Sequence, residues 1–96
     1  MLVTVDIGNT NITIGIFDKD ELIGTYRLTT KVRRTSDEYG FMLKNFLDRS
    51  NVHEKQIEAV IVSSVVPKVM HSFTNGIKKF VGIEPLIVGP GIKSGI

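Results

Sequence analysis

A single carboxylate, Asp6, lies near the end of an otherwise apolar stretch at the start of the chain. Residues 2–7, LVTVDI, alternate in polarity as a strand does. Burying a carboxylate in such a strand costs free energy unless a cation or hydrogen-bond donors accompany it. Because a divalent metal ion would supply that partner, we interpret Asp6 as a candidate metal ligand.

The polar turn that follows Asp6 is rich in hydrogen-bond donors. Residues 8–11 read GNTN, and Thr13 follows shortly after them. Gly8 allows a ligand to approach the backbone closely, and successive N–H groups of a turn can converge on an anion. An ordinary hairpin turn has the same composition. A carboxylate beside a donor-rich turn nevertheless supplies the parts of a nucleotide-phosphate site.

Three strands joined by short turns are expected to position these residues. Residues 2–7 and 12–17 flank the polar turn with period-two patterns and predict a β-hairpin, and residues 22–30 predict a third strand. Gly24 lies inside this third strand and indicates a bulge or the close approach of another segment. The strands would form an antiparallel meander.

Two helices are predicted in the rest of the chain. Thr35 and Glu38 fit a capping box, so a first helix should begin there and end near Arg49, which also explains the acidic first turn without catalysis. Pro67 and Gly82 bracket a second helix, residues 67–80. The apolar residues of each helix share one face: Tyr39, Met42, Leu43, Phe46 and Leu47 in the first, and Val69, Met70, Phe73, Ile77 and Phe80 in the second.

Residues 57–66, IEAVIVSSVV, predict a fourth strand covered on both faces. A right-handed crossover would place it parallel to the first strand, so that residues 8–11 and 63–66 meet at one edge of the sheet. Residues 85–88 predict a short fifth strand. The order βββαβαβ resembles that of an α/β, ribonuclease-H-like half domain with a mixed five-stranded sheet.

The stretch DIGNTNITIGIFD, residues 6–18, resembles the first phosphate motif of the acetate and sugar kinase, Hsp70 and actin superfamily, in the DxGNT form of type III pantothenate kinases. Further motifs follow in that family's order over essentially the whole chain. They are Arg27-Leu28-Thr29-Thr30, Arg34-Thr35-Ser36-Asp37-Glu38-Tyr39, Ser63-Ser64-Val65-Val66-Pro67 and Val88-Gly89-Pro90-Gly91-Ile92-Lys93. The chain is thus similar to the N-terminal portion of a type III pantothenate kinase.

This resemblance implies a complete enzyme that transfers the γ-phosphoryl group of ATP to pantothenate, giving 4'-phosphopantothenate in the first step of coenzyme A synthesis. Its cofactors would be ATP, Mg²⁺ and a monovalent cation, K⁺ or NH₄⁺, and Asp6 would hold Mg²⁺ directly or through water. The residues implied in cofactor binding are Asp6, Ile7, Gly8, Asn9, Thr10, Asn11, Ile12 and Thr13.

Enzymes of the family are more than twice as long as this chain. Their G-A-D-R motif, whose Asp is the proposed general base, and the aspartate for the monovalent cation come after the part that this sequence resembles. By the resemblance we expect the general base to lie beyond Ile96, so no catalytic residue is assigned within the sequence. We expect residues 1–96 to form the N-terminal actin-like ATPase lobe, without the second lobe and inactive alone. The complete enzyme would be a homodimer.

Composition excludes several classes of protein. A net charge of +2 is too small to indicate nucleic-acid binding, and no apolar run approaches the roughly 18 residues of a membrane span. The absence of cysteine excludes disulfides and thiolate metal sites, and a cytoplasmic location is expected. The apolar content of 42% is enough for one modest core.

Alternatives to a pantothenate kinase stay open from the sequence. Baf-type transcriptional accessory factors share the resemblance, and Lys31, Arg33 and Arg34 could then contact DNA. Another kinase or phosphatase of the superfamily could use the same turn on another substrate. His53 and His71 belong to no metal-ligand spacing and are interpreted as structural or solvated.

Overall fold

The structure is a computed structural model that describes residues 1–89 of the chain. The predicted order βββαβαβ is confirmed, with one addition, a short 3₁₀ helix before the fourth strand. The elements are β1 (Leu2–Ile7), β2 (Asn11–Asp18), β3 (Glu21–Thr29), α1 (Ser36–Arg49), η1 (Glu54–Gln56), β4 (Ala59–Ser64), α2 (Pro67–Phe80) and β5 (Leu86–Val88).

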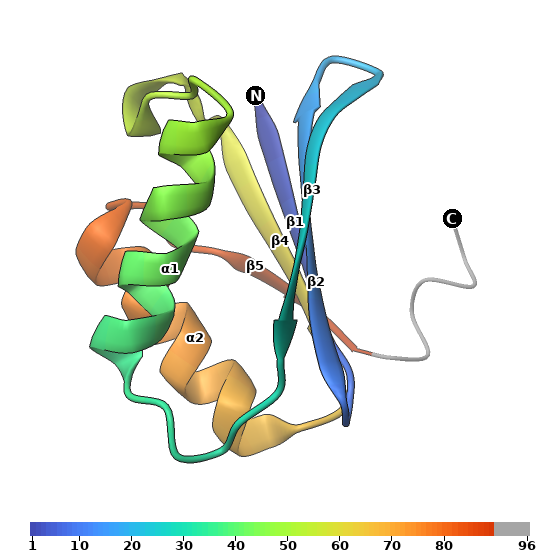
Figure 1. Cartoon of the computed structure of the whole chain (residues 1–96), viewed down its shortest axis with the longest axis vertical. Helices are drawn as coiled ribbons and strands as arrows, with labels where there is room; N and C mark the ends of the chain where they lie inside the picture. The colour runs from blue at the N-terminus through green and yellow to red at the C-terminus, as the bar shows by residue number, and fades with distance from the viewer. Residues whose placement is uncertain (90–96) are drawn as a thin grey trace.

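The strands form one mixed sheet in the order β3-β2-β1-β4-β5 (Figure 1). β1 lies at its centre, antiparallel to β2 and parallel to β4, and β4 is parallel to β5. The expected parallel pairing of the first and fourth strands is therefore confirmed. Asp6 pairs with Thr13 of β2 on one side and with Ser63 of β4 on the other.

Both helices cover the same face of the sheet (Figure 1). The buried side chains of the helices pack against every second side chain of the strands, because alternate strand residues point toward the helices. This layer is the hydrophobic core. Its main members are Val3, Val5, Ile7, Ile12, Ile14, Ile16, Val60, Val62, Tyr39, Leu43, Leu47, Val69, Phe73 and Ile77.

The opposite side of the sheet, which we call the open face, is covered by no helix within residues 1–89. The prediction that the fourth strand is covered on both faces is therefore wrong for this part of the chain. In β4, Val60 and Val62 are buried whereas Ala59, Ile61 and Ser63 are partly exposed. The apolar run gave a wrong prediction because it does not show on which face of the sheet each helix packs. Helices that follow one another in the chain can cover the same face.

Gly24 of β3 lies beside a bulge and at a close approach of another segment, as its residue type predicts. The register of β2 and β3 shifts between Ile16 and Phe17, so Ile23 is the inserted residue of a bulge. Gly24 beside it also permits a close approach, because a Cβ there would lie 2.7 Å from Ser50 Oγ. Both predictions for Gly24 are confirmed.

The capping box of α1 is present as predicted. The Thr35 backbone N–H donates to Glu38 Oε1 at 2.8 Å, and the Glu38 N–H donates to Thr35 Oγ1 at 3.2 Å. The first of these hydrogen bonds is the main cause that lowers the pKa of Glu38 below its ordinary value. At the end of α2, Gly82 has φ +78° and donates its N–H to the Lys78 carbonyl at 3.1 Å, as a helix-ending glycine does.

Two glycines bring the helices into backbone contact. A Cβ on Gly76 of α2 would lie 2.5 Å from the Ser36 carbonyl oxygen and 2.8 Å from the Gly40 nitrogen. A Cβ on Gly40 of α1 would lie 2.8 Å from the Gly76 carbonyl oxygen. The obstacles are backbone atoms, which cannot rotate away, so only glycine fits at this crossing.

We expect Gly76→Ala to destabilise the protein although alanine is the better helix former by about 1 kcal/mol. Overlap with α1 must separate the helices, and such overpacking costs about 1–3 kcal/mol. Urea unfolding measures the change, with the exposed Lys78→Ala on the same helix as control. A stabilised Gly76→Ala would contradict the close crossing.

Candidate functional site

Asp6 is exposed on the open face of the sheet. Its neighbours Val5 and Ile7 point the other way into the core, as strand alternation requires. The expectation of a buried carboxylate that needs a partner is therefore wrong, because α1 and α2 both lie on the far face. Within residues 1–89 the Asp6 carboxylate makes no ion pair or hydrogen bond, which leaves its oxygens accessible to a cation in solution.

The turn after Asp6 is closed and tied to the end of β3. The Gly8 N–H donates to the Asn11 carbonyl at 2.9 Å, so it serves the turn itself. Thr30 then holds two turn carbonyls: its Oγ1 donates to Gly8 at 2.8 Å, and its N–H donates to Thr10 at 2.8 Å. These bonds fix the turn in place beside the carboxyl end of β1.

Thr30 is a positioning residue that the sequence analysis missed. It lies in the Arg27-Leu28-Thr29-Thr30 motif, to which we gave no role. The sequence did carry one sign of this role, since the motif ends in polar residues directly after a predicted strand. The turn that Thr30 binds, however, lies far away in the sequence. Pairing of β3 with β2 brings Thr30 to the turn.

The donors that stay available at the turn are the backbone N–H groups of Asn9 and Thr10. They donate to no acceptor within residues 1–89. The side chains of Asn9, Thr10, Asn11 and Thr13 are exposed and likewise make no hydrogen bond within this part of the chain. A Cβ on Gly8 would lie 3.2 Å from the Asn11 oxygen, so the turn is tight at its base. This donor set fits a phosphate group.

The two apolar residues of the motif anchor the turn from below. Ile7 and Ile12 are completely buried and directly paired across β1 and β2. Their side chains lie in the core on the helix side of the sheet. They hold the turn in place rather than face the open side.

The end of β4 lies beside the end of β1, as predicted. The Val65 N–H donates to the Ile7 carbonyl at 3.1 Å, which continues the parallel pairing. Ser63 is on the open face next to Asp6, whereas the Ser64 hydroxyl accepts the Val66 N–H at 2.9 Å and shapes the entry into α2. Ser63 therefore joins the candidate site, and Ser64 has a structural role.

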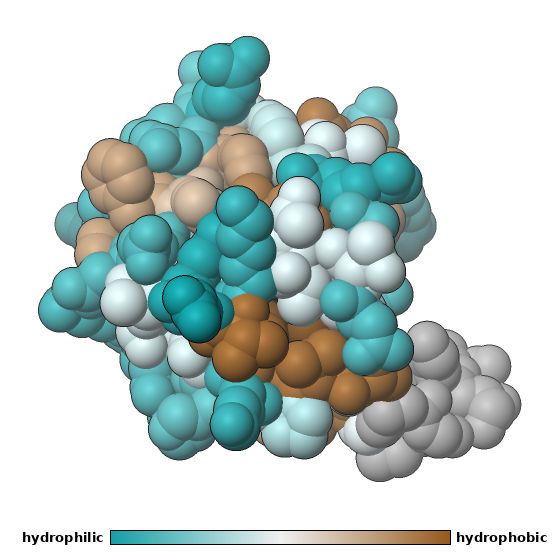
Figure 2. Space-filling view, turned by 60° about the horizontal axis from the view of Figure 1, so that its bottom comes forward, coloured by the Kyte–Doolittle hydropathy of each residue, from teal (hydrophilic) through white to brown (hydrophobic). Residues whose placement is uncertain are grey.

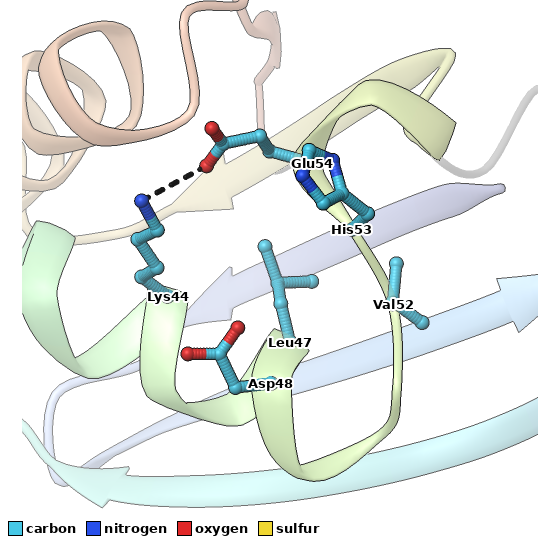
Figure 3. A pocket seen from close by; sticks show the side chains of 6 residues that line it. All are labelled: Lys44, Leu47, Asp48, Val52, His53 and Glu54. Atoms are coloured by element: carbon cyan, nitrogen blue, oxygen red, sulfur yellow. Dashed lines mark ion pairs between the residues drawn. The ribbon is translucent and has the colours of Figure 1, made fainter.

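A small pocket between the end of α1 and η1 holds His53 (Figure 3). Its volume of about 100 Å³ is too small for a nucleotide. Lys44 Nζ and Glu54 Oε2 pair across it at 3.1 Å, and His53 Nδ1 accepts the Lys55 N–H at 3.1 Å. His53 thus caps η1, which confirms its interpretation as a structural residue.

The basic segment after β3 is partly committed to holding its own loop. Arg34 donates to the Thr29 carbonyl at 2.8 Å, and its guanidinium carbon lies 5.8 Å from the centre of the Tyr39 ring. The Tyr39 hydroxyl in turn donates to the Lys31 carbonyl at 2.6 Å. Part of the charge that could have contacted DNA therefore stabilises the connection between β3 and α1.

The last predicted motif lies mostly outside the described residues. Val88 ends β5 and Gly89 follows it, whereas residues 90–93 are beyond the part of the chain that the structure describes. Ile96, beyond which the general base is expected, also lies outside the described residues. The position of that base therefore stays a prediction, and no catalytic base is assigned within residues 1–89.

No helix within residues 1–89 is long and apolar enough to cross a membrane. The same part of the chain holds no cluster of three or more His, Cys, Asp or Glu side chains able to hold a metal ion by themselves. Within residues 1–89, Asp6 is therefore not part of such a cluster.

The fold is shared with solved structures of low sequence identity. A ROK hexokinase from Thermus thermophilus matches with a TM-score of 0.70 at 14% identity, over 92% of this chain and 34% of that one. RuvC from T. thermophilus, in complex with a Holliday junction, matches with a TM-score of 0.60 at 17% identity, over 93% of this chain and 64% of that one. These similarities confirm the predicted α/β half-domain fold.

Sequence comparison gives a narrower assignment. The family model "Type III pantothenate kinase" matches residues 2–96. Proteins named type III pantothenate kinase from Bifidobacterium longum (strain DJO10A) and Agathobacter rectalis are 57% and 50% identical to it over all 96 residues. The chain spans 38% and 37% of the lengths of these relatives. Because the family model matches nearly its full length, the chain belongs to the type III pantothenate kinase family.

Proposed function

We propose that the turn between β1 and β2 binds the phosphates of MgATP, and that the complete protein uses them to phosphorylate pantothenate. The observation that carries this proposal is the exposed Asp6 carboxylate beside the uncommitted N–H groups of Asn9 and Thr10. Family membership supplies the substrate, since the relatives are named pantothenate kinases.

The ligands at the turn fit a magnesium ion shared with a nucleotide. Mg²⁺ is usually held by one or two carboxylates together with phosphates and water. Asp6 would be the carboxylate, and Ser63 lies next to it on the same face. When bound, the ion would neutralise phosphate charge during transfer.

The chain's own residues would act chiefly by positioning. The Asn9 and Thr10 N–H groups and the Thr13 hydroxyl would donate to phosphate oxygens, and the bonds from Thr30 would keep the turn rigid as they do so. Phosphoryl transfer depends on such positioning and charge stabilisation. The general base of the complete enzyme would come from the part of the protein beyond Ile96.

Hydrophobic surface lies at the end of the molecule where the turn between β1 and β2 is found. It supports the proposal that residues 1–96 are one lobe of a larger enzyme. Figure 2 shows apolar side chains gathered at this end. Val32, after β3, and Val65, after β4, are 56% and 52% exposed. Such a patch is typical of an interaction surface. We propose that the rest of the protein completes the site here.

Further features of the complete enzyme follow from the family resemblance alone. We propose that it works in the cytoplasm as a homodimer and uses a monovalent cation, K⁺ or NH₄⁺, besides Mg²⁺. The regulatory alternative gains no support from Arg34, whose guanidinium is engaged by its own loop.

Asp6→Asn in the complete protein is expected to lower kcat/KM for pantothenate phosphorylation by about 100-fold or more, because the anionic ligand that would hold Mg²⁺ against the reacting phosphates is neutralised. A coupled assay for ADP release with Mg²⁺ and K⁺ measures this. Asp18→Asn, an exposed carboxylate at the other end of β2, is the matched control and should keep parental activity. Full activity of Asp6→Asn would remove Asp6 from the mechanism.

Thr30→Val keeps the side-chain shape but deletes the hydrogen bond to the Gly8 carbonyl. One such bond contributes about 1 kcal/mol, so ATP affinity should fall about fivefold if the turn must be held rigid. Calorimetric titration with ATP and Mg²⁺ measures the change, and Thr74→Val, which deletes the hydrogen bond from Thr74 Oγ1 to the His71 carbonyl on α2, is the control. Equal affinities of the two variants would show that Thr30 has no part in binding.

A further inference from the structure

Arg27 of β3 belongs to a line of side chains that crosses the open face at the level of Asp6. The strand registers pair Arg27 with Thr13, Thr13 with Asp6, and Asp6 with Ser63. Directly paired residues of neighbouring strands project to the same face. We call Arg27, Thr13, Asp6 and Ser63 the Asp6 row.

The guanidinium of Arg27 is not engaged by the described part of the protein. Its side chain is exposed and forms no ion pair or hydrogen bond within residues 1–89. Arg34, in contrast, donates to the Thr29 carbonyl, and Lys44, Lys78 and Lys79 each pair with a carboxylate. Arg27 is thus available to an anion above the sheet.

The distance from Arg27 to Asp6 suits a ligand that lies between them. Neighbouring strands are about 4.8 Å apart, which places the two Cα atoms about 10 Å from each other across Thr13. A shallow pocket of about 320 Å³ adjoins this part of the row and is lined by Thr13, Thr25, Tyr26 and Arg27. An arginine side chain is long enough to extend over Thr13 toward the metal side.

Charge gives the reason for a cation at this position. The donors proposed at the turn are neutral, and Asp6 adds a negative charge of its own. A nucleoside triphosphate keeps a net negative charge even with Mg²⁺ bound, and a guanidinium binds phosphate oxygens in a bidentate manner. Arg27 is the cation of the Asp6 row and lies on the opposite side of Thr13 from the carboxylate.

We propose that Arg27 binds the terminal phosphate of the nucleoside triphosphate and neutralises charge on the group that is transferred. This inference rests on the proposed function of the turn. Arg27 would contact the γ-phosphate, which ATP has and ADP lacks.

The test compares binding of ATP and ADP, each with Mg²⁺, to the complete protein by calorimetry. Because a charge-assisted hydrogen bond contributes about 1.5–3 kcal/mol, Arg27→Ala should weaken ATP binding by about 10- to 100-fold. ADP binding should change by less than about threefold. Arg27→Lys should lie between parent and Arg27→Ala. Arg33→Ala, an exposed arginine outside the row, is the matched control and should bind both nucleotides as the parent does.

Other outcomes separate the two levels of the proposal. If Arg27→Ala binds ATP as the parent does, or loses ATP and ADP affinity equally, the Arg27 contact is wrong while phosphate binding at the turn stands. If the parent binds neither nucleotide, the proposed function fails and the Arg27 contact fails with it. Thermal unfolding of each variant shows whether it is folded, and Arg27→Lys preserves the test should Arg27→Ala unfold.

Discussion

The hydrogen-bonded pairing of β1 on both of its edges is the constraint on which the rest of the structure depends. The antiparallel partner β2 fixes the turn that follows Ile7, and the parallel partner β4 brings Ser63 and Val65 to the same end. Because both ladders fix the register, a slip of one residue would turn Asp6 into the core and Ile7 out to water. The buried isoleucines and valines on the helix side oppose such a slip.

One-sided packing gives the site its character. α1 and α2 cover one face together and cross at Gly40 and Gly76, where their backbones touch. The open face therefore carries polar and charged residues at the level of Asp6 without a desolvation cost. An exposed carboxylate with rigid donors beside it is suited to a ligand that brings its own charge and its own metal.

Local patterns in the sequence predicted the elements well because each has a nearby physical cause. The alternation of residues 2–7, the capping pair Thr35 and Glu38, and the glycine at the end of α2 all act within a few residues. The parallel placement of β4 followed from the rule for crossover connections. These predictions needed no knowledge of distant contacts.

The predictions that failed, and the features that were missed, depend on contacts between distant segments. Alternation along β1 shows that the side chains of Asp6 and Val5 point to opposite faces of the sheet. It does not show which of the two faces the helices cover. Thr30 acquires its role through a turn some twenty residues earlier in the chain. Gly40 and Gly76 did leave a signal, since glycine inside a helix is unfavourable and often marks close packing.

The most direct measurement of nucleotide binding at the turn is NMR spectroscopy of the labelled complete protein titrated with ATP and Mn²⁺, a paramagnetic substitute for Mg²⁺. Binding at Asp6 predicts that the amide signals of Asn9, Thr10 and Ser63 broaden first, whereas those around His53 in the small pocket do not. Broadening centred on the His53 pocket, or on any segment distant from β1, would contradict the site described above.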